Sequence, residues 1–572
     1  MKGSAETGPP ARGAARPQAR DASIDARSRA RLTALLASFA LLAQASPAWA
    51  GSDDAAWIAG RAIALTAGVL VAALVALTRT GSRVRLIPAI GLYLLFGSLF
   101  RYGLIDDAYI SLRYAGNLAA GDGLVWNPGE RVEGYTSFLW VVVLGLLHAV
   151  TRIPLELLAT AGSIGCGIGC LVAVDRLATR LSRDRRPSSL PSLLLAAYLP
   201  LAFWGFSGME TALFVWLLLA FLERVAAAFD GESLRYRDGL LLAGGLLLCR
   251  PEAYAYVPLL LSALARRDPR GLLRGAVGAL TLAVPHLVVR RLFYGDFLPN
   301  TFYVKVDFSS AQLMAHGISY LAEGALPHLP LLVGAVWGLI RLRRGGGPRP
   351  QDLLLPLTLA TALGIAVYTG GDHFRELRFF LVPSAVLAVM AAPAAAATAP
   401  GSARWFRTAG AAGLAVALLL LTVYHRDLGR SSSLQFGAAI TRRWRAAGEW
   451  LRTQASPGDL LATPVAGAIP FVSGLPTIDM LGLNDRVIAR KPVRLGVDSR
   501  DHEKFDAAYV LGREPRWIFL GHFAAADLGD AARRCAVMPV YRDLFQHLPR
   551  DRYELVTGRS PGAAWTFLRR KD

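Results

Sequence analysis

The sequence contains few charged residues for a chain of its length. Asp, Glu, Lys and Arg make up only 18% of its 572 residues, whereas an ordinary soluble protein carries about 25%. Hydrophobic residues make up 53%, and the mean hydropathy is +0.38. Apolar runs of about 17–22 residues recur along most of the chain without alternating with polar residues, which excludes a membrane β-barrel. The composition therefore predicts a polytopic α-helical membrane protein with about 12–13 transmembrane helices.

Cysteine is also scarce. Cys166, Cys170 and Cys249 lie in apolar runs, and Cys535 lies near the C-terminal end. Their spacing gives no pairing framework and no metal-ligand pattern, and no His or carboxylate accompanies the one close pair. We therefore expect small core residues, not a disulfide scaffold or a cysteine-bound metal.

Acidic residues are fewer than basic ones, 42 against 62, which gives a net charge of +20. Such an excess could indicate a nucleic-acid partner. The basic residues cluster, however, in short loops between apolar runs, as the positive-inside rule requires of cytoplasmic loops. If these basic loops are cytoplasmic and successive spans cross the membrane in opposite directions, every acid-bearing motif of the membrane part lies outside the cytoplasmic membrane. The charge therefore predicts a lipid bilayer as the environment and no nucleic acid.

Changes in composition divide the chain into four parts. Residues 1–31 are expected to be a disordered basic cytoplasmic leader, and residues 32–84 a signal-like segment or extra transmembrane helices. Residues 85–430 form the membrane core with a first outer loop at 102–155, and residues 431–572 form a soluble outer α/β domain. In the core, Leu190–Phe206 is expected to be one span and Phe138–Val150 a short interfacial helix. In the outer domain, Arg442–Gln454 has helical periodicity, and Glu503–Leu511 is also expected to be a helix. Short apolar runs predict strands at Leu460–Thr463, Thr477–Met480, Trp517–Leu520 and Trp565–Leu568.

Two adjacent carboxylates, Asp106 and Asp107, follow a long apolar segment at the start of the first outer loop. Sugar transfer from an activated phosphate needs a base that removes the proton of the attacking hydroxyl. An apolar wall and a neighbouring carboxylate raise the pKa of such a group toward a useful value. One member could instead orient the acceptor or hold a divalent cation. The alternative is a pair that only marks a helix end.

The rest of that loop supplies further polar candidates. Arg113, Arg131, Glu133 and Tyr135 could bind substrate, and Gly134 would let the backbone approach a ligand closely. The alternative for Glu133 is an ordinary salt bridge with Arg131.

Charges also interrupt later apolar runs. Glu210 lies in a turn between two predicted spans, where it could bind substrate or accept N–H groups of the following helix. Arg250-Pro251-Glu252 suggests a broken helix that lines a cavity, in which Arg250 could bind a lipid phosphate. The alternative is an Arg250–Glu252 pair that satisfies itself.

Further candidates lie in two later loops and in the outer domain. They are Asn300, Lys305, Asp372, His373, Arg375 and Arg378. The cations among them could hold a lipid phosphate, whereas His373 beside Asp372 is too little for a metal site. Residues 479–485 and 502–504 are more typical of structural turns.

The motif residues resemble a known group of enzymes. Residues 106–115 (DDAYISLRYA), with 127–136 (NPGERVEGYT), resemble the first outer loop of bacterial GT-C glycosyltransferases, the group of the mycobacterial terminal β-(1→2) arabinofuranosyltransferases. Residues 207–211, 250–252, 294–305 and 370–372 are similar to later signatures of that group, in the same order. The N-terminal segment to residue 85 looks like an addition to that pattern.

The resemblance implies a GT-C membrane core with a soluble outer domain. It implies inverting transfer of a sugar, such as the pentofuranose arabinose, from a polyprenyl-phosphate donor to a hydroxyl of a cell-envelope glycan or glycolipid. The base would be Asp106 or Asp107. A lipid-linked glycan flippase would instead be expected to have ionisable groups near the bilayer midplane and internal repeats, and the sequence shows neither. A lipid-linked phosphotransferase also fits outer acids and cations.

Overall fold

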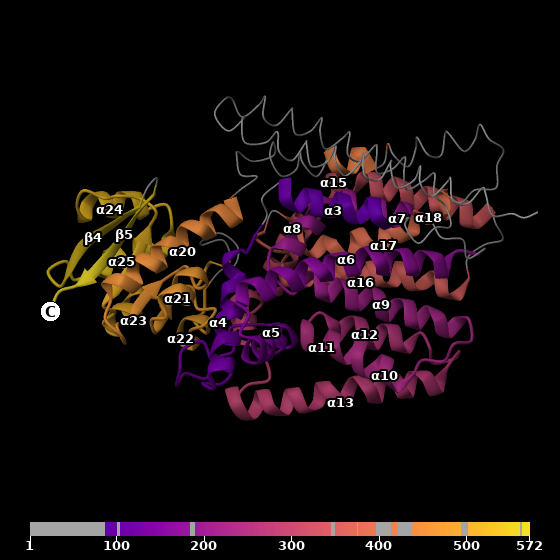
Figure 1. The fold of residues 1–572 in the computed structure, drawn as a ribbon, viewed down its shortest axis with the longest axis horizontal. Helices are drawn as coiled ribbons and strands as arrows, with labels where there is room; N and C mark the ends of the chain where they lie inside the picture. Colours follow the sequence, from indigo (N-terminus) through magenta and orange to yellow (C-terminus); the bar gives the residue numbers. More distant parts are fainter. Residues whose placement is uncertain are drawn as a thin grey trace, which may run out of the picture. The chain divides into compact units, whose positions relative to one another are not determined.

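The computed structural model describes residues 86–99, 103–183, 189–344, 349–374, 376–395, 413, 415–420, 436–493, 502–560 and 563–572 (Figure 1). The expectations for residues 1–84 therefore lie outside the described residues, as does the candidate Arg375. The described residues comprise a helical core and a C-terminal α/β domain.

The helical core contains five helices that are long and apolar enough to cross a membrane, within the described ranges. Four shorter apolar helices accompany them. The expected total of about 12–13 includes segments outside the described residues. The core helices are α3 (Ile87–Leu99), α4 (Asp106–Ala120), α5 (Phe138–Thr151), α6 (Leu155–Leu181), α7 (Leu190–Ala197), α8 (Leu199–Phe206), α9 (Thr211–Phe229), α10 (Tyr236–Asp238), η3 (Gly239–Gly244), α11 (Gly245–Cys249), α12 (Ala253–Ser262), α13 (Pro269–Tyr294), α14 (Asn300–Lys305), α15 (Ser310–Arg344), η4 (Pro350–Leu353), α16 (Leu354–Thr369), η5 (Arg378–Phe380), α17 (Leu381–Met390) and α18 (Ala392–Ala395).

Two expectations for the core need correction. Residues 190–206 are not one span but two eight-residue helices, α7 and α8, which meet at Tyr198 in an extended conformation. A proline in the first turn of each helix removes a backbone donor where none is needed. The first outer loop is also not all loop, because the segment that begins with the two aspartates is the helix α4.

The loops between the long helices gather at two opposite ends of the bundle. At one end Arg180 of α6 binds Glu223 at 3.0 Å and Glu232 at 2.8 Å, and Arg349 donates to the carbonyl of Leu181. These loops are the ones predicted to be cytoplasmic. The signature motifs lie at the other end, where α4, α9 and α16 begin or finish. Acids are nevertheless not confined to that end, which corrects the expected segregation: the acids at the arginine-rich end neutralise its arginines.

The C-terminal domain is a five-stranded sheet between two layers of helices (Figure 1). The strand order is β2-β1-β3-β5-β4, with β1, β2 and β3 parallel and β5 antiparallel to both of its neighbours. Side chains of β3 alternate between two cores: Trp517 and Phe519 face one, and Ile518 and Leu520 face the other. The strands are β1 (Leu461–Thr463), β2 (Thr477–Asp479), β3 (Trp517–Gly521), β4 (Tyr553–Ser560) and β5 (Ala563–Arg570). The helices are α20 (Phe436–Gln454), α21 (Ala468–Ser473), α22 (Arg486–Ala489), α23 (Ala507–Gly512), α24 (Leu528–Cys535) and α25 (Pro539–His547).

The four expected strands and the helix at Arg442–Gln454 are present. Strand β4 was not expected. The helix expected at Glu503–Leu511 begins only at Ala507, because Asp506 caps it and residues 502–506 are not helical.

Candidate active site

The two aspartates begin α4, where negative charges suit the free N–H groups of a helix N-terminus. The N–H of Ile105, which precedes them, donates to the carbonyl of Ser207 at 3.3 Å. Gly208 packs so closely on Leu104 that a Cβ there would lie 2.0 Å from Leu104 Cδ2. The first two signature motifs are therefore neighbours, and Asp106 and Asp107 lie beside the turn that leads to Glu210.

The side chains of the two aspartates have different surroundings. Asp106 Oδ2 accepts the N–H of Gly467 at 3.0 Å, and Oδ1 accepts that of Ala468 at 2.7 Å, both in the C-terminal domain. Burial raises the pKa of Asp106 to about 7, against the lowering effect of these two hydrogen bonds. Asp107 is half-buried, and among the described residues its carboxylate has no hydrogen-bond or ion-pair partner.

Glu210, Arg250 and Glu252 form one buried charge cluster. The Arg250 guanidinium binds the Glu210 carboxylate and also Glu252, with Nη2 2.7 Å from Oε1. The expected Arg250–Glu252 pair is thus present, but it is not isolated. Glu210 occupies the N-cap position of α9 without capping it through its side chain, so its carboxylate is committed to Arg250.

The loop between α16 and η5 brings its charges to the same end of the bundle. Arg378 Nε lies 2.7 Å from Oδ2 of Asp372, whose side chain is fully buried. The Arg378 guanidinium also lies over the Trp204 ring, 5.4 Å from its centre. His373 lies 3.5 Å from Asp372, and its ring lies 5.5 Å from that of His502 in the C-terminal domain.

A small cavity of about 30 Å³ joins these two groups. Arg250, Glu252 and Arg378 line it together with Thr211, whose buried hydroxyl has no hydrogen-bond partner within the described part of the chain. Its remaining lining is mostly apolar: Phe214, Val215, Tyr256, Ala362, Ile365, Phe379 and Val382. The cavity therefore combines two guanidinium groups and a spare hydroxyl with apolar walls.

A second buried group ties the first loop to α13. Glu133 pairs with Arg290, not with Arg131, and Arg290 Nε lies 2.9 Å from Glu133 Oε2. Burial raises the pKa of Glu133 to about 7, although the positive charge of Arg290 opposes the shift. The hydroxyl groups of Tyr135 and Tyr294 lie 3.0 Å apart. Arg290 was not predicted from the sequence, although an arginine at the end of an apolar helix was a signal for it.

The other candidates in these loops have structural partners. Arg113 is buried and donates to the carbonyls of Trp126, Pro470 and Leu475. The Asn300 amide donates to three carbonyls of residues 482–485. Arg131 is exposed over the Phe293 ring at 4.8 Å, and Lys305 is half-buried at the end of α14. Arg113 and Asn300 thus join the core to the C-terminal domain.

The acids of residues 479–485 hold turns, as expected. Asp479 accepts the N–H groups of Leu481 and Asn484, and Asp485 caps α22. Burial raises the pKa of Asp479 to about 6. Its negative charge also contributes to the raised pKa of Asp106. Among the described residues, no group of three His, Cys, Asp or Glu side chains has a geometry that could hold a metal ion.

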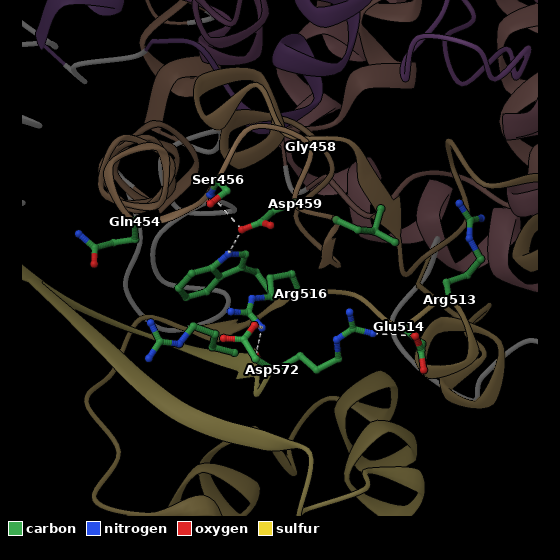
Figure 2. Close-up of a pocket in the computed structure, with 12 residues that line it drawn as sticks. Gln454, Ser456, Gly458, Asp459, Arg513, Glu514, Arg516 and Asp572 are labelled. Carbon is green, nitrogen blue, oxygen red and sulfur yellow. Dashed lines mark hydrogen bonds and ion pairs between the residues drawn. The ribbon is translucent and has the colours of Figure 1, made fainter.

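A larger polar cavity of about 570 Å³ lies in the C-terminal domain at the amino ends of β1 and β3 (Figure 2). Its arginines are already neutralised: Arg516 binds Asp572 at 2.7 Å, and Arg570 binds Glu514 at 2.8 Å. Asp106 instead contacts the loop that follows the carboxyl end of β1. This cavity is therefore at the sheet edge opposite the aspartates.

Comparison with known proteins places these features in context. The terminal β-(1→2)-arabinofuranosyltransferase of Mycobacterium tuberculosis is 27% identical over 337 residues, which cover 55% of this chain and 49% of that protein. The enzyme of the same name from Corynebacterium glutamicum is 29% identical over 343 residues, which cover 51% of this chain and 48% of that protein. The chain thus spans about half the length of the curated relatives it matches. Residues 434–568 match a domain of unknown function, DUF8728.

Solved structures decide the fold. ArnT from Cupriavidus metallidurans, bound to undecaprenyl phosphate, matches with a TM-score of 0.54 at 11% identity, covering 85% of this chain and 98% of ArnT. An oligosaccharyltransferase from Archaeoglobus fulgidus matches with a TM-score of 0.51 at 12% identity, covering 85% and 74%. This chain has the GT-C fold. The predicted polytopic helical membrane fold with a C-terminal α/β domain, and the resemblance to bacterial GT-C glycosyltransferases, are confirmed.

Proposed function

We propose that this GT-C protein is an inverting glycosyltransferase that moves a sugar from a polyprenyl-phosphate donor to a hydroxyl of a cell-envelope glycan or glycolipid. The proposal depends on the surroundings of the Asp107 carboxylate. Its carboxylate has no partner among the described residues, and it lies beside the turn that leads to the buried arginine cluster. Both curated relatives are named arabinofuranosyltransferases, which supports arabinofuranose as the sugar.

In the proposed reaction Asp107 removes the proton of the acceptor hydroxyl. The hydroxyl oxygen then bonds to the anomeric carbon of the donor sugar, on the face opposite the phosphate. The bond between that carbon and the phosphate oxygen breaks, and polyprenyl phosphate leaves with the electron pair. A positioned base of this kind contributes about 10²–10⁴-fold to the rate.

We assign the leaving phosphate to the cavity lined by Arg250 and Arg378. Guanidinium groups bind phosphate oxygens through paired N–H groups. The cavity of about 30 Å³ has room for only about one water, so its walls must move apart when the donor binds. The Thr211 hydroxyl supplies a further donor. Glu210, Glu252 and Asp372 already neutralise these arginines, so both guanidinium groups must exchange carboxylate for phosphate when the donor binds.

The test is transfer of labelled sugar in vesicles that contain the purified protein, a polyprenyl-phosphate pentose and an envelope glycan. We expect Asp107→Asn to lower kcat by about 10²–10⁴-fold. Asp122→Asn removes an exposed acid that follows α4 and should leave kcat unchanged. Full activity of Asp107→Asn would remove the carboxylate on which the proposal depends.

We also propose that the motif-bearing end of the bundle faces away from the cytoplasm. The proposal rests on the arginines at the opposite end, which include Arg180 in the last turn of α6, Arg224 of α9 and Arg349 just before η4. An alkaline phosphatase fused at Gly371 should be active, and one fused at Gly231 should be silent. The reverse pattern would place the site in the cytoplasm.

A further inference from the structure

One face of α4 contacts the short helix α21 of the C-terminal domain at both ends. Asp106 holds the amides of Gly467 and Ala468, where α21 begins. Two turns later Arg113 donates to the carbonyls of Pro470 at 2.5 Å and Leu475 at 2.8 Å, near the end of α21. The helix α21 is therefore held along α4 by an acid at its start and a base at its end.

Between these two contacts the helices pack through aromatic rings. The Tyr109 and Phe471 rings lie 5.3 Å apart between centres. Asp106, Tyr109 and Arg113 are spaced by three and four residues and so share one face of α4. Asp107 is one residue further along and is rotated about 100° from this face. Helical geometry therefore gives the two adjacent carboxylates different neighbours.

The contact at Gly467 leaves no space for a side chain. A Cβ at this position would lie 1.9 Å from the backbone oxygen of Asp106. Glycine thus permits the close approach that brings two amides to one carboxylate. The segment between β1 and β2 is also the kind of turn in which parallel α/β domains commonly bind an anionic ligand group. Here the core's own aspartate occupies it.

We propose that Asp106 is a positioning residue that docks the C-terminal domain on α4, and that Asp107 alone acts on the acceptor hydroxyl. Both oxygens of Asp106 accept backbone N–H groups, whereas the Asp107 carboxylate has no partner among the described residues. The division of labour rests on the proposed transferase function, but the docking role does not. The domain matched by residues 434–568 then completes the site from the side of α4.

Hydrogen–deuterium exchange of residues 467–475 and acceptor kinetics test the proposal together on the full-length protein. Asp106→Ala and Gly467→Ala should each speed exchange there by about tenfold or more, because a lost hydrogen bond to a charged group changes stability by that order. Both should raise the acceptor KM more than they lower kcat. Asp107→Asn should lower kcat with unchanged exchange. Gly512→Ala, at an exposed glycine with open space around it, is the control.

Two outcomes would overturn the proposal. One is unchanged exchange in Asp106→Ala. The other is a kcat loss in Asp106→Ala as large as in Asp107→Asn, without a matching loss in Gly467→Ala. If Gly467→Ala does not fold, Arg113→Gln replaces it, since it loosens the other end of α21. A fully active Asp107→Asn with faster exchange in Asp106→Ala would refute the transferase proposal and leave the docking role intact.

Discussion

The buried Glu133–Arg290 pair makes a prediction whose size depends on pH. Burial raises the pKa of Glu133 from 4.5 to about 7 even with Arg290 beside it. Because this acid binds its proton more tightly in the folded than in the unfolded protein, its contribution to stability falls between pH 4.5 and 7 and is constant above 7. Replacing Arg290 by methionine removes the charge that limits the shift. In Arg290→Met the decline should therefore continue above pH 7.

The expected size follows from the free energy of one pKa unit, about 1.4 kcal/mol. If Glu133 stays protonated throughout this pH range in folded Arg290→Met, the free energy of unfolding of the variant is lower than that of the unchanged protein. The difference is up to about 0.4 kcal/mol at pH 7, about 1.4 kcal/mol at pH 8 and about 2.7 kcal/mol at pH 9. The lost hydrogen bond from Arg290 to the Phe297 carbonyl adds about 1 kcal/mol at every pH.

Unfolding of the detergent-solubilised protein, followed by tryptophan fluorescence at pH 7, 8 and 9, measures this difference. Arg291→Met removes the exposed neighbouring arginine and should show no such slope. The double variant Glu133→Gln, Arg290→Met should also lose the slope, since it has no carboxyl group to titrate. An equal cost of Arg290→Met at pH 7 and pH 9 would refute the reasoning.

Three further substitutions probe other contacts. Gly134→Ala should lower the free energy of unfolding by about 1–3 kcal/mol, because its Cβ would lie 1.9 Å from Asn484 Oδ1; Gly91→Ala, which has open space, is the control. Asn300→Leu should cost a similar amount by leaving buried carbonyls unpaired, and limited proteolysis should then release the C-terminal domain more readily. Thr211→Val should change stability by less than about 0.5 kcal/mol, because its hydroxyl has no hydrogen-bond partner among the residues that the structure describes, but should raise the donor KM several-fold. An unchanged donor KM would place the phosphate elsewhere.

The sequence predicted the elements of the fold better than the contacts between them. Long apolar runs determine helices almost by themselves. The short apolar runs of β1, β3 and β5 were readable because these strands are buried on both faces between distinct cores. Strand β4 was missed because its half-buried sequence, Tyr553–Ser560, has only two consecutive apolar residues, Leu555 and Val556. The break at Tyr198 was missed because both of its flanks are apolar.

For the candidate site, the sequence identified charged residues but not their partners. Glu133 was assigned an alternative pairing with Arg131, two residues away, yet it binds Arg290 at a separation of 157 residues. Arg113 was expected to bind substrate, yet it binds carbonyls of the C-terminal domain. Local spacing cannot reveal such pairs, because tertiary packing alone brings them together. The roles proposed for Asp107, Arg250 and Arg378 stay predictions for the experiments above.

The contact between Asp106 and Gly467 also sets an order in time. Its two partners are separated by 361 residues. A ribosome that adds 5–20 residues per second needs roughly 20 to 70 s to make the intervening chain. During that interval α4 and its aspartates have left the ribosome while the helix that packs on them does not yet exist. The aspartates therefore acquire their final surroundings only near the end of synthesis, after the membrane helices between α4 and the C-terminal domain have been made.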